Sequence, residues 1–541
     1  MEFTYTQKRE AHSYAQRSVT MGPRGMVASS QHLATQSGYR ALSKGGNAVD
    51  AAVAMVATLN VVEPQSVGIG GDAFALIHLA DKDRLIGMNA SGRSPHNATL
   101  DDYHKNGFQE VPERGIFSIT VPGALHGWAQ AVERYGKLPF SDALEDAIFY
   151  AENGFPVSEV IAGDWESARE LLLSRNDSAK AYLINGKAPR PGQVFQNRDL
   201  AKTMKKIAAD GVDTFYQGEI RDAMVDFLIQ HNGLFSKKDF SDHTTTWVEP
   251  ISAPYRGYTV YELPPNGQGL TALQMLNILE GFDIASLGHN SPEYLHCLIE
   301  AKKLAFGDRD YHITDPEAEN VPVDVLISKD YAETCRKQID LKQAMNPPSP
   351  SALINSSETV YVTAIDSDRN AVSFISSIFK HFGSGVVVDG TGIILQNRGK
   401  SFSLDPDHPN RMAPHKRPMH TIIPGMVFKD DKLMMSFGVM GGDMQPQGHT
   451  QFLANLIDFK LNLQEAIDAP RVRHMQGKEV FVEDGIPDET KSMLEDKGHR
   501  VIRDKPATNQ VGGGQAIFLD RNQNVLYGAS DRRKDGCAIG Y

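Results

Sequence analysis

Thr359 is the residue whose position in the sequence most clearly permits chemistry. It follows the small, polar run Ser356-Ser357-Glu358 and opens the alternating segment Val360–Ile365, which reads as a strand. If the chain is cut before Thr359, one residue carries both a hydroxyl nucleophile and a free α-amine that can act as its base. The ordinary pKa of such an amine, about 7.7–8.0, lies close to neutral pH, where a general base works best. Threonine also opens many ordinary strands, so this pattern alone does not separate a catalytic role from a structural one.

A second segment that could take part in catalysis is the turn Gly441-Gly442. It follows a strand expected over 432–437 and precedes a helix expected over 447–459. Adjacent glycines before a helix expose backbone N–H groups, which can stabilise a developing oxyanion together with the helix dipole. A plain strand-to-helix turn would have the same sequence, so both interpretations stay open on the turn alone.

Three other short patterns carry little weight. The segment Gly68–Ala73 resembles a dinucleotide fingerprint, but its glycines lead into a strand instead of a helix, which favours a tight turn. The run Ser377–Lys380 matches Ser-x-x-Lys without the Lys-Thr-Gly that should follow it. His408, His415 and His420 are separated by prolines and lack helical i,i+4 spacing, so no metal site is expected there.

The composition excludes several classes of protein. The 541 residues suffice for a large core, and the formal charge of −12 argues against nucleic acid or an anionic membrane as the main partner. The three cysteines are far apart, which predicts free thiols and no disulfide framework. The N-terminus has no apolar segment of a secretory signal, and no stretch is long enough to span a membrane, so we expect a cytoplasmic protein.

Helical and strand patterns are unevenly distributed along the chain. Helices are expected over 33–44 and 48–60, and Asn47 can cap the second of these. The run Pro347–Ser351 has the composition of a linker, and alternating strands such as 360–365 and 371–375 follow it. A helical first part and a strand-rich second part predict layers that share one core.

Several longer motifs together resemble the γ-glutamyltransferase family of N-terminal-nucleophile hydrolases, and the similarity runs from Met26 nearly to Tyr541. The motifs are Gly45-Gly46-Asn47-Ala48-Val49-Asp50-Ala51-Ala52, Glu63-Pro64-Gln65-Ser66-Val67-Gly68-Ile69-Gly70-Gly71, Pro264-Pro265-Asn266-Gly267-Gln268-Gly269, Phe382-Gly383-Ser384-Gly385, Gly390-Thr391-Gly392-Ile393-Ile394-Leu395-Gln396-Asn397 and Asp531-Arg532-Arg533-Lys534-Asp535-Gly536. So many matches in one order form a strong signal.

The resemblance implies a precursor that cuts itself between Glu358 and Thr359. Residues 1–358 would become a large subunit and residues 359–541 a small one, folded together as one α/β (α+β) unit, a four-layer αββα sandwich. Thr359 would attack a small-molecule amide, Ser377 would supply a helper hydroxyl, and Gly441 and Gly442 would form the oxyanion hole. No metal or other cofactor is expected, and the sequence does not decide whether the protein is a homo-oligomer.

The chain departs from the family pattern at the positions that recognise substrate. Val360 replaces a second threonine after the nucleophile. Phe379 replaces an asparagine that binds the substrate's α-amino group, and Arg398 and Ser401 align with two polar or acidic positions that share this task. Since Phe379 cannot accept a hydrogen bond and Arg398 repels a cation, an acyl group without the ammonium fits better.

The positions that hold a substrate carboxylate also differ. His420 and Thr421 replace a pair of serines, and Arg93, in an altered setting, is the nearest counterpart of the family's carboxylate-binding arginine. The sequence therefore predicts a self-processing N-terminal-threonine amidohydrolase or acyltransferase acting on γ-glutamyl- or glutaryl-type amides, as in the cephalosporin acylase branch. The alternatives are a true glutathione hydrolase and γ-glutamyl transferase, and a catalytically silent homologue that acts as a binding protein.

Overall fold

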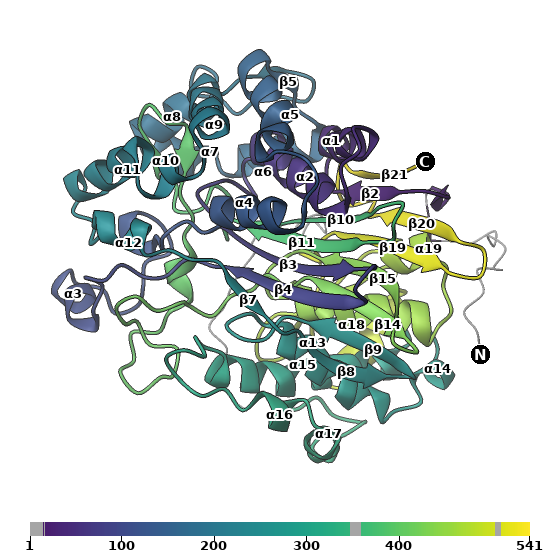
Figure 1. Ribbon diagram of the computed structural model, residues 1–541. Coiled ribbons are helices and arrows are strands. Elements are labelled where there is room, and N and C mark those ends of the chain that lie inside the picture. The colour runs from purple at the N-terminus through teal and green to yellow at the C-terminus, as the bar shows by residue number, and fades with distance from the viewer. Residues whose placement is uncertain (1–13, 16, 347–358, 504–509) are drawn as a thin grey trace.

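Two seven-stranded antiparallel sheets form the centre of the molecule (Figure 1). The computed structural model describes residues 14–15, 17–346, 359–503 and 510–541. The first sheet has the order β21 (Cys537–Gly540), β2 (Met26–Ser29), β10 (Val360–Ile365), β11 (Ala371–Ser377), β3 (Asp72–Leu79), β4 (Arg84–Ala90), β7 (Thr246–Val248). The second has the order β1 (Thr20–Gly22), β20 (Val525–Ser530), β19 (Gly514–Asp520), β15 (Lys432–Val439), β14 (Gly425–Lys429), β9 (Tyr258–Glu262), β8 (Ile251–Tyr255).

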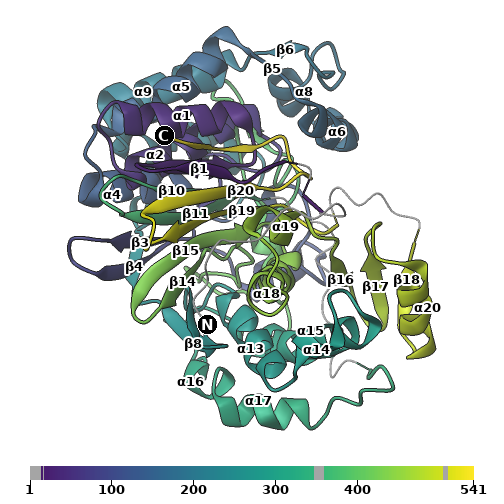
Figure 2. The same ribbon diagram turned by 90° about the vertical axis from the view of Figure 1, so that its right-hand side faces the viewer.

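Helices cover the outer face of each sheet (Figure 2). The first sheet is covered by α1 (His32–Ser43), α2 (Ala48–Val62) and α4 (Ala124–Tyr135), and α5 (Phe140–Asn153) packs on the outer side of α2. The second is covered by α13 (Gly269–Glu280) and α18 (Met444–Ile457), with α15 (Pro292–His312) beside them. Apolar residues of the facing strands, among them Phe74, Tyr361 and Met426, pack between the two sheets. This arrangement confirms the expected four-layer αββα sandwich.

The remaining elements are shorter and surround these layers. The other helices are α3 (Leu100–Lys105), α6 (Glu159–Ser167), α7 (Arg169–Leu173), α8 (Asn176–Tyr182), α9 (Arg198–Asp210), α10 (Asp213–Tyr216), α11 (Glu219–Gln230), α12 (Lys237–Ser241), α14 (Ile284–Leu287), α16 (Val323–Leu326), α17 (Lys329–Arg336), α19 (Leu463–Asp468), α20 (Asp488–Asp496) and the 3-10 turns η1 (Ile116–Ser118) and η2 (Arg398–Ser401). The small sheets pair β5 (Phe155–Pro156) with β6 (Val194–Phe195), β12 (Val387–Val388) with β13 (Ile393–Ile394), and β17 (Glu479–Val482) with β16 (Val472–His474) and β18 (Arg500–Ile502). None of the helices in the described part of the chain is both long and apolar enough to cross a lipid bilayer.

Helix α2 shows how the sequence builds the outer layer. The Asn47 side chain accepts hydrogen bonds from N–H groups of the first turn, and the Asp50 carboxylate accepts one from the Asn47 backbone N–H, which completes a capping box. Every residue of α2 is buried, so its alanine-rich sequence allows close packing on β10 and β11.

The predicted distribution of elements needs one correction. The expected strand 360–365 coincides with β10, and 371–375 extends to Ser377 in β11. The first part of the chain contributes the expected strand after the glycine turn, β3, which pairs with β11. It also contributes strands that were not expected, such as β2 beside β10 and β9 beside β14. The linker Pro347–Ser351 and Glu358 lie outside the described residues.

Candidate active site

Thr359 immediately precedes β10, an interior strand of the first sheet, and is fully buried. Its Oγ1 donates a hydrogen bond of 3.3 Å to Ser377 Oγ at the end of β11. Antiparallel pairing of the two strands aligns Val360 with Ser376, which places the flanking hydroxyl groups side by side. The Phe379 N–H donates to Ser377 Oγ at 2.8 Å. The structure therefore brings together the two hydroxyl residues predicted from the sequence and orients both.

The glycine turn after β15 presents two backbone donors. Gly441 and Gly442 have φ of +120° and +59°, conformations that side chains other than glycine rarely adopt. Among the described residues, neither of their N–H groups donates to a protein acceptor. The N–H groups of Met444 and Gln445 bond the Gly441 and Gly442 carbonyls at 3.0 Å, which starts helix α18 at this turn. This geometry is suited to binding an oxyanion.

Arg398 is a buried cation with free donors. Its Nη1 donates to Thr421 Oγ1 at 2.9 Å, and its guanidinium stacks on the ring of Phe379, 4.0 Å from the centroid. Within the described part of the chain, Arg398 Nε and Nη2 have no hydrogen-bond partner. Burial lowers the pKa of Arg398 to about 9, so the side chain remains charged at neutral pH. A buried cation with unpaired donors is suited to bind an anionic ligand group.

Both ring nitrogens of His420 form hydrogen bonds with other protein groups. Its Nε2 donates to Asp72 Oδ2 at 3.1 Å, and its Nδ1 accepts from the Ile422 N–H at 3.3 Å. Burial, followed by the charge of Arg398, lowers the pKa of His420 to about 4, so the ring is neutral. The role of His420 in binding a substrate carboxylate stays a prediction that this geometry does not support, since both ring nitrogens are occupied.

Asp72 is a site residue that the sequence analysis did not identify. It begins β3 and pairs in register with Ser377. Its Oδ1 accepts from the Gly92 N–H at 2.8 Å and from Gln396 Nε2 at 2.9 Å, while Oδ2 holds His420. The sequence signal for Asp72 was its place between Gly70-Gly71 and the mostly apolar remainder of β3. A carboxylate buried at such a position needs several hydrogen-bond donors.

Arg93 is bound to acidic residues. Its Nη1 lies 2.9 Å from Asp315 Oδ2, and its Nη2 lies 2.8 Å from Glu317 Oε2. Both ends of the guanidinium fork are therefore paired in the structure. The substrate-binding role expected for Arg93 stays a prediction, and of these two arginines Arg398 is the one with unpaired donors among the described residues.

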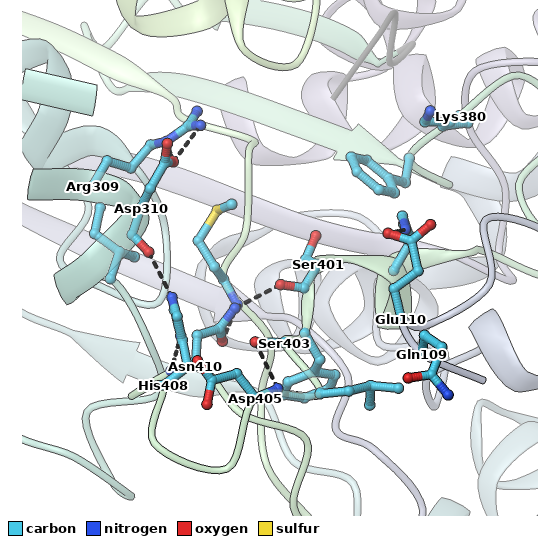
Figure 3. Close-up of a pocket in the computed structure, with 16 residues that line it drawn as sticks. Gln109, Glu110, Arg309, Asp310, Lys380, Ser401, Ser403, Asp405, His408 and Asn410 are labelled. Carbon is cyan, nitrogen blue, oxygen red and sulfur yellow. Dashed lines mark hydrogen bonds and ion pairs between the residues drawn. The ribbon is translucent and has the colours of Figure 1, made fainter. Parts of the chain in front are cut away.

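A pocket of about 430 Å³ opens beside Phe379 and has the size of a small-molecule site (Figure 3). Arg309 and Asp310 lie on one side of it and Lys380 on the other. Ser401, which aligns with a substrate-binding position of the family, also lines this pocket, and its buried Oγ has no partner among the described residues. The pocket thus reaches Phe379 and Ser401, two positions aligned with the family's recognition residues, whereas Arg398 and Thr359 do not line it.

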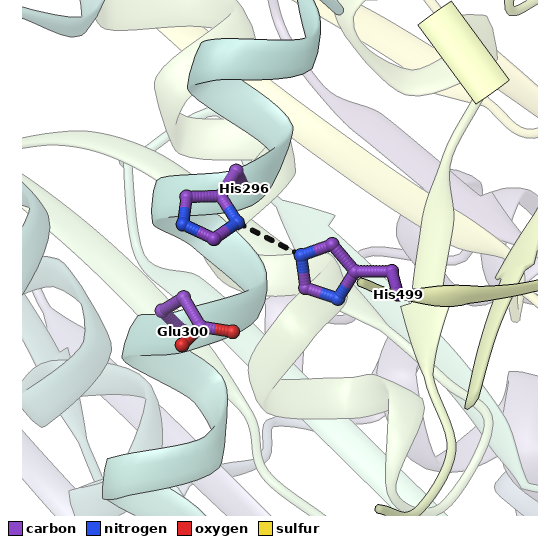
Figure 4. A group of neighbouring side chains, drawn as sticks. All are labelled: His296, Glu300 and His499. Atoms are coloured by element: carbon purple, nitrogen blue, oxygen red, sulfur yellow. Dashed lines mark hydrogen bonds between the residues drawn. The ribbon is translucent and has the colours of Figure 1, made fainter. Parts of the chain in front are cut away.

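A second group of buried polar side chains lies elsewhere and joins α15 to the loop before β18 (Figure 4). His296 Nε2 donates to the Asp340 carbonyl at 2.8 Å, so its Nδ1 accepts from His499 Nε2 at 2.8 Å. Burial lowers the pKa of His499 to about 3. Glu300 Oε1 accepts from Lys303 Nζ at 2.7 Å. The bond between His296 and His499 links α15 to the loop before β18, while Glu300 is paired with Lys303 of its own helix.

Comparison with known proteins places this site in a family. Residues 34–541 match the family described as Gamma-glutamyltranspeptidase. The glutathione hydrolase-like YwrD proenzyme of Bacillus subtilis (strain 168) is 41% identical over 526 residues, covering 96% of this chain and 99% of that protein. The acylase ACY 1 proenzyme of Pseudomonas sp. (strain SE83) is 35% identical over 549 residues, covering 98% and 96%.

A solved structure shows the same relationship. The crystal structure of cephalosporin acylase from Bacillus halodurans superposes with a TM-score of 0.92 at 42% identity, covering 100% of this chain and 99% of that one. These relatives are enzymes, which confirms the prediction of a hydrolase or acyltransferase and the N-terminal-nucleophile hydrolase fold. The chain belongs to the gamma-glutamyltranspeptidase family.

Proposed function

We propose that the chain is a self-processing amidohydrolase whose nucleophile is Thr359 and whose substrates are glutaryl- or γ-glutamyl-type amides. The observation that carries the proposal is an unbroken series of contacts from the candidate nucleophile to the candidate oxyanion turn. It runs in order through Thr359, Ser377, Phe379, Arg398, Thr421, Gln268 and Gly442. The proenzyme names of both curated relatives support a chain that matures by cleavage.

In this proposal, cleavage between Glu358 and Thr359 yields subunits of residues 1–358 and 359–541. The freed α-amine of Thr359 takes the proton of Oγ1, and Oγ1 attacks the amide carbonyl. The N–H groups of Gly441 and Gly442 stabilise the tetrahedral oxyanion. The protonated amine then gives its proton to the leaving nitrogen, and water releases the acyl group from Thr359 by the same steps.

The substrate class follows from the charge of the recognition site. The free donors of Arg398 suit a carboxylate at the end of the acyl chain, as in a glutaryl group. An α-ammonium group beside Phe379 and Arg398 would meet an aromatic ring and a cation, with no acceptor supplied by either side chain. Glutaryl amides are therefore proposed as better substrates than γ-glutamyl amides.

The proposal is tested with three anilides of the same leaving group: glutaryl, γ-glutamyl and the uncharged pentanoyl. We expect kcat/KM for glutaryl to exceed that for γ-glutamyl at least about tenfold, since an unpaired polar substrate group is strongly disfavoured. Preference for γ-glutamyl would favour the alternative of a true glutathione hydrolase. If the chain stays uncut and hydrolyses none of the three anilides, the alternative of a catalytically silent binding protein is favoured.

The helper hydroxyl has a measurable role in this scheme. We expect Ser377→Ala to lower kcat about tenfold, because the hydrogen bond that orients Thr359 Oγ1 is lost. Ser376→Ala is the matched control, since the Ser376 hydroxyl donates to the Asp72 backbone carbonyl and, among the described residues, forms no hydrogen bond with Thr359. Initial rates of anilide hydrolysis on matured protein give both values, and equal losses in the two variants would argue against the role of Ser377.

A further inference from the structure

The side-chain amide of Gln268 bridges the two loops that form the candidate site. Gln268 immediately precedes α13 and is fully buried. Its Nε2 donates to the Thr421 carbonyl at 2.6 Å and to the Gly442 carbonyl at 2.9 Å. We propose that Gln268 is a positioning residue for the oxyanion turn, an inference that rests on the function proposed above for Gly441 and Gly442.

The contact with Arg309 determines the orientation of the Gln268 side-chain amide. Arg309 Nη1 lies 3.0 Å from Gln268 Oε1, and because arginine only donates, that atom must be the carbonyl oxygen. Both hydrogens of the amide nitrogen then face the two backbone carbonyls. All three polar contacts of the Gln268 amide are thereby satisfied with a single orientation.

Arg309 also contacts the residue that follows the oxyanion turn. Arg309 Nη1 lies 2.6 Å from Asp443 Oδ1, and Asp443 directly follows Gly442. The guanidinium also stacks on Phe306, 3.9 Å from the ring centroid, which fixes its plane. Arg309 thus reaches the oxyanion turn directly through Asp443 and indirectly through Gln268.

Such support matters because the turn is built from glycines. Gly441 and Gly442 have more backbone conformations available than other residues, and both occupy the left-handed region. An oxyanion hole works by preorganised donors that do not reorient during the reaction. The Gly442 carbonyl lies in the peptide plane that joins Gly442 to Asp443. Fixing this plane limits the rotation of the Gly442 backbone, and so it restricts the orientation of the adjacent Gly442 N–H.

The bridge also crosses the proposed cleavage boundary. Gln268 and Arg309 belong to residues 1–358, while Thr421, Gly442 and Asp443 belong to residues 359–541. The large segment therefore completes the oxyanion turn of the small segment that carries the nucleophile.

The test uses Gln268→Glu, which keeps the shape of the side chain and replaces its two donors by an acceptor. We expect kcat for glutaryl anilide to fall about 10- to 100-fold, since misplaced donors weaken transition-state stabilisation. KM is expected to change less than about threefold, because Gln268 forms no direct contact with Arg398, the group proposed to bind the acyl carboxylate, and bonds only the backbone carbonyl of Thr421. An alkylboronic acid with a terminal carboxylate, which forms a tetrahedral adduct on a hydroxyl, should lose affinity in proportion to kcat.

Gln451→Glu is the matched control. Gln451 is also buried and also donates to two backbone carbonyls, those of Gln447 and Val472, but it does not contact the turn. Gln268→Met, which removes the donors without adding charge, replaces Gln268→Glu if that variant does not mature. The proposal is overturned if kcat and boronate affinity stay unchanged in the Gln268 variant. It is also overturned if Gln451→Glu lowers kcat and boronate affinity by as much as the Gln268 variant does. A wild-type protein that is uncut and inactive would instead contradict the proposed function itself.

Discussion

Replacing Thr359 by alanine is expected to leave the chain uncut and to abolish amide hydrolysis. In the proposed mechanism this residue supplies both the attacking hydroxyl and, after cleavage, the α-amine that serves as base. Loss of a nucleophile of this kind lowers kcat by at least about 10⁴-fold. A denaturing gel of the purified chain and the rate of glutaryl anilide hydrolysis measure the two effects.

Two variants on the same strand sharpen this prediction. Thr359→Ser keeps a hydroxyl and an α-amine, so it should mature and retain part of the activity. Thr363→Ala removes a buried hydroxyl of β10 that bonds Ser436 and lies away from the site, so it should mature like the wild type. A Thr359→Ala chain that is cut at the same bond, or that hydrolyses the anilide, would contradict the assignment of the nucleophile.

Replacing Arg398 by methionine is expected to remove the preference for acyl groups that carry a carboxylate. Truncating one member of a buried charge pair costs about 2–5 kcal/mol, so kcat/KM for glutaryl anilide should fall by about 30- to 4,000-fold. The uncharged pentanoyl anilide should change less than about threefold, because it makes no ionic contact with Arg398.

Stability provides a second readout for the same variant. In the ligand-free protein Arg398 is a buried cation whose Nε and Nη2 are unpaired, and such a charge is costly to bury. Arg398→Met should therefore keep or raise the melting temperature while substrate selection is lost. Equal losses of kcat/KM for the charged and uncharged anilides would show that Arg398 does not recognise the carboxylate.

Local patterns predicted much of the scaffold. The alternation of β-branched residues marked β10 with its observed ends, and the Asn47 cap marked the start of α2. These features depend on neighbours within a few positions, so the sequence contains their full signal. The number of strands contributed by the first part of the chain was underestimated, because strand pairing depends on residues hundreds of positions apart.

The candidate site was predictable only where a motif or the family resemblance named the residue. Thr359 and Ser377 meet as expected, since they end paired strands. Asp72 and Gln268 were missed because their roles depend on partners far away in the sequence, His420 and Gly442 respectively. No local pattern distinguishes a buried carboxylate or amide with such partners from an exposed one.

The recognition residues illustrate the same limit. Phe379 and Arg398 each depart from the family pattern, and each departure predicted a changed preference for charge. Their stacking, and the two donors that it leaves free on Arg398, emerge only when the two loops are placed together. Arg93 is the opposite case, a residue predicted to bind substrate whose donors are occupied. The sequence does not reveal that Asp315 and Glu317 pair with its guanidinium.

The N-termini of the purified wild-type protein test the central claim most directly. Intact mass and N-terminal sequencing should find two fragments, residues 1–358 and 359–541, with Thr359 as the first residue of the second. A wild-type chain that remains whole after long incubation, or that is cut at a different bond, would contradict the account of Thr359 as an N-terminal nucleophile.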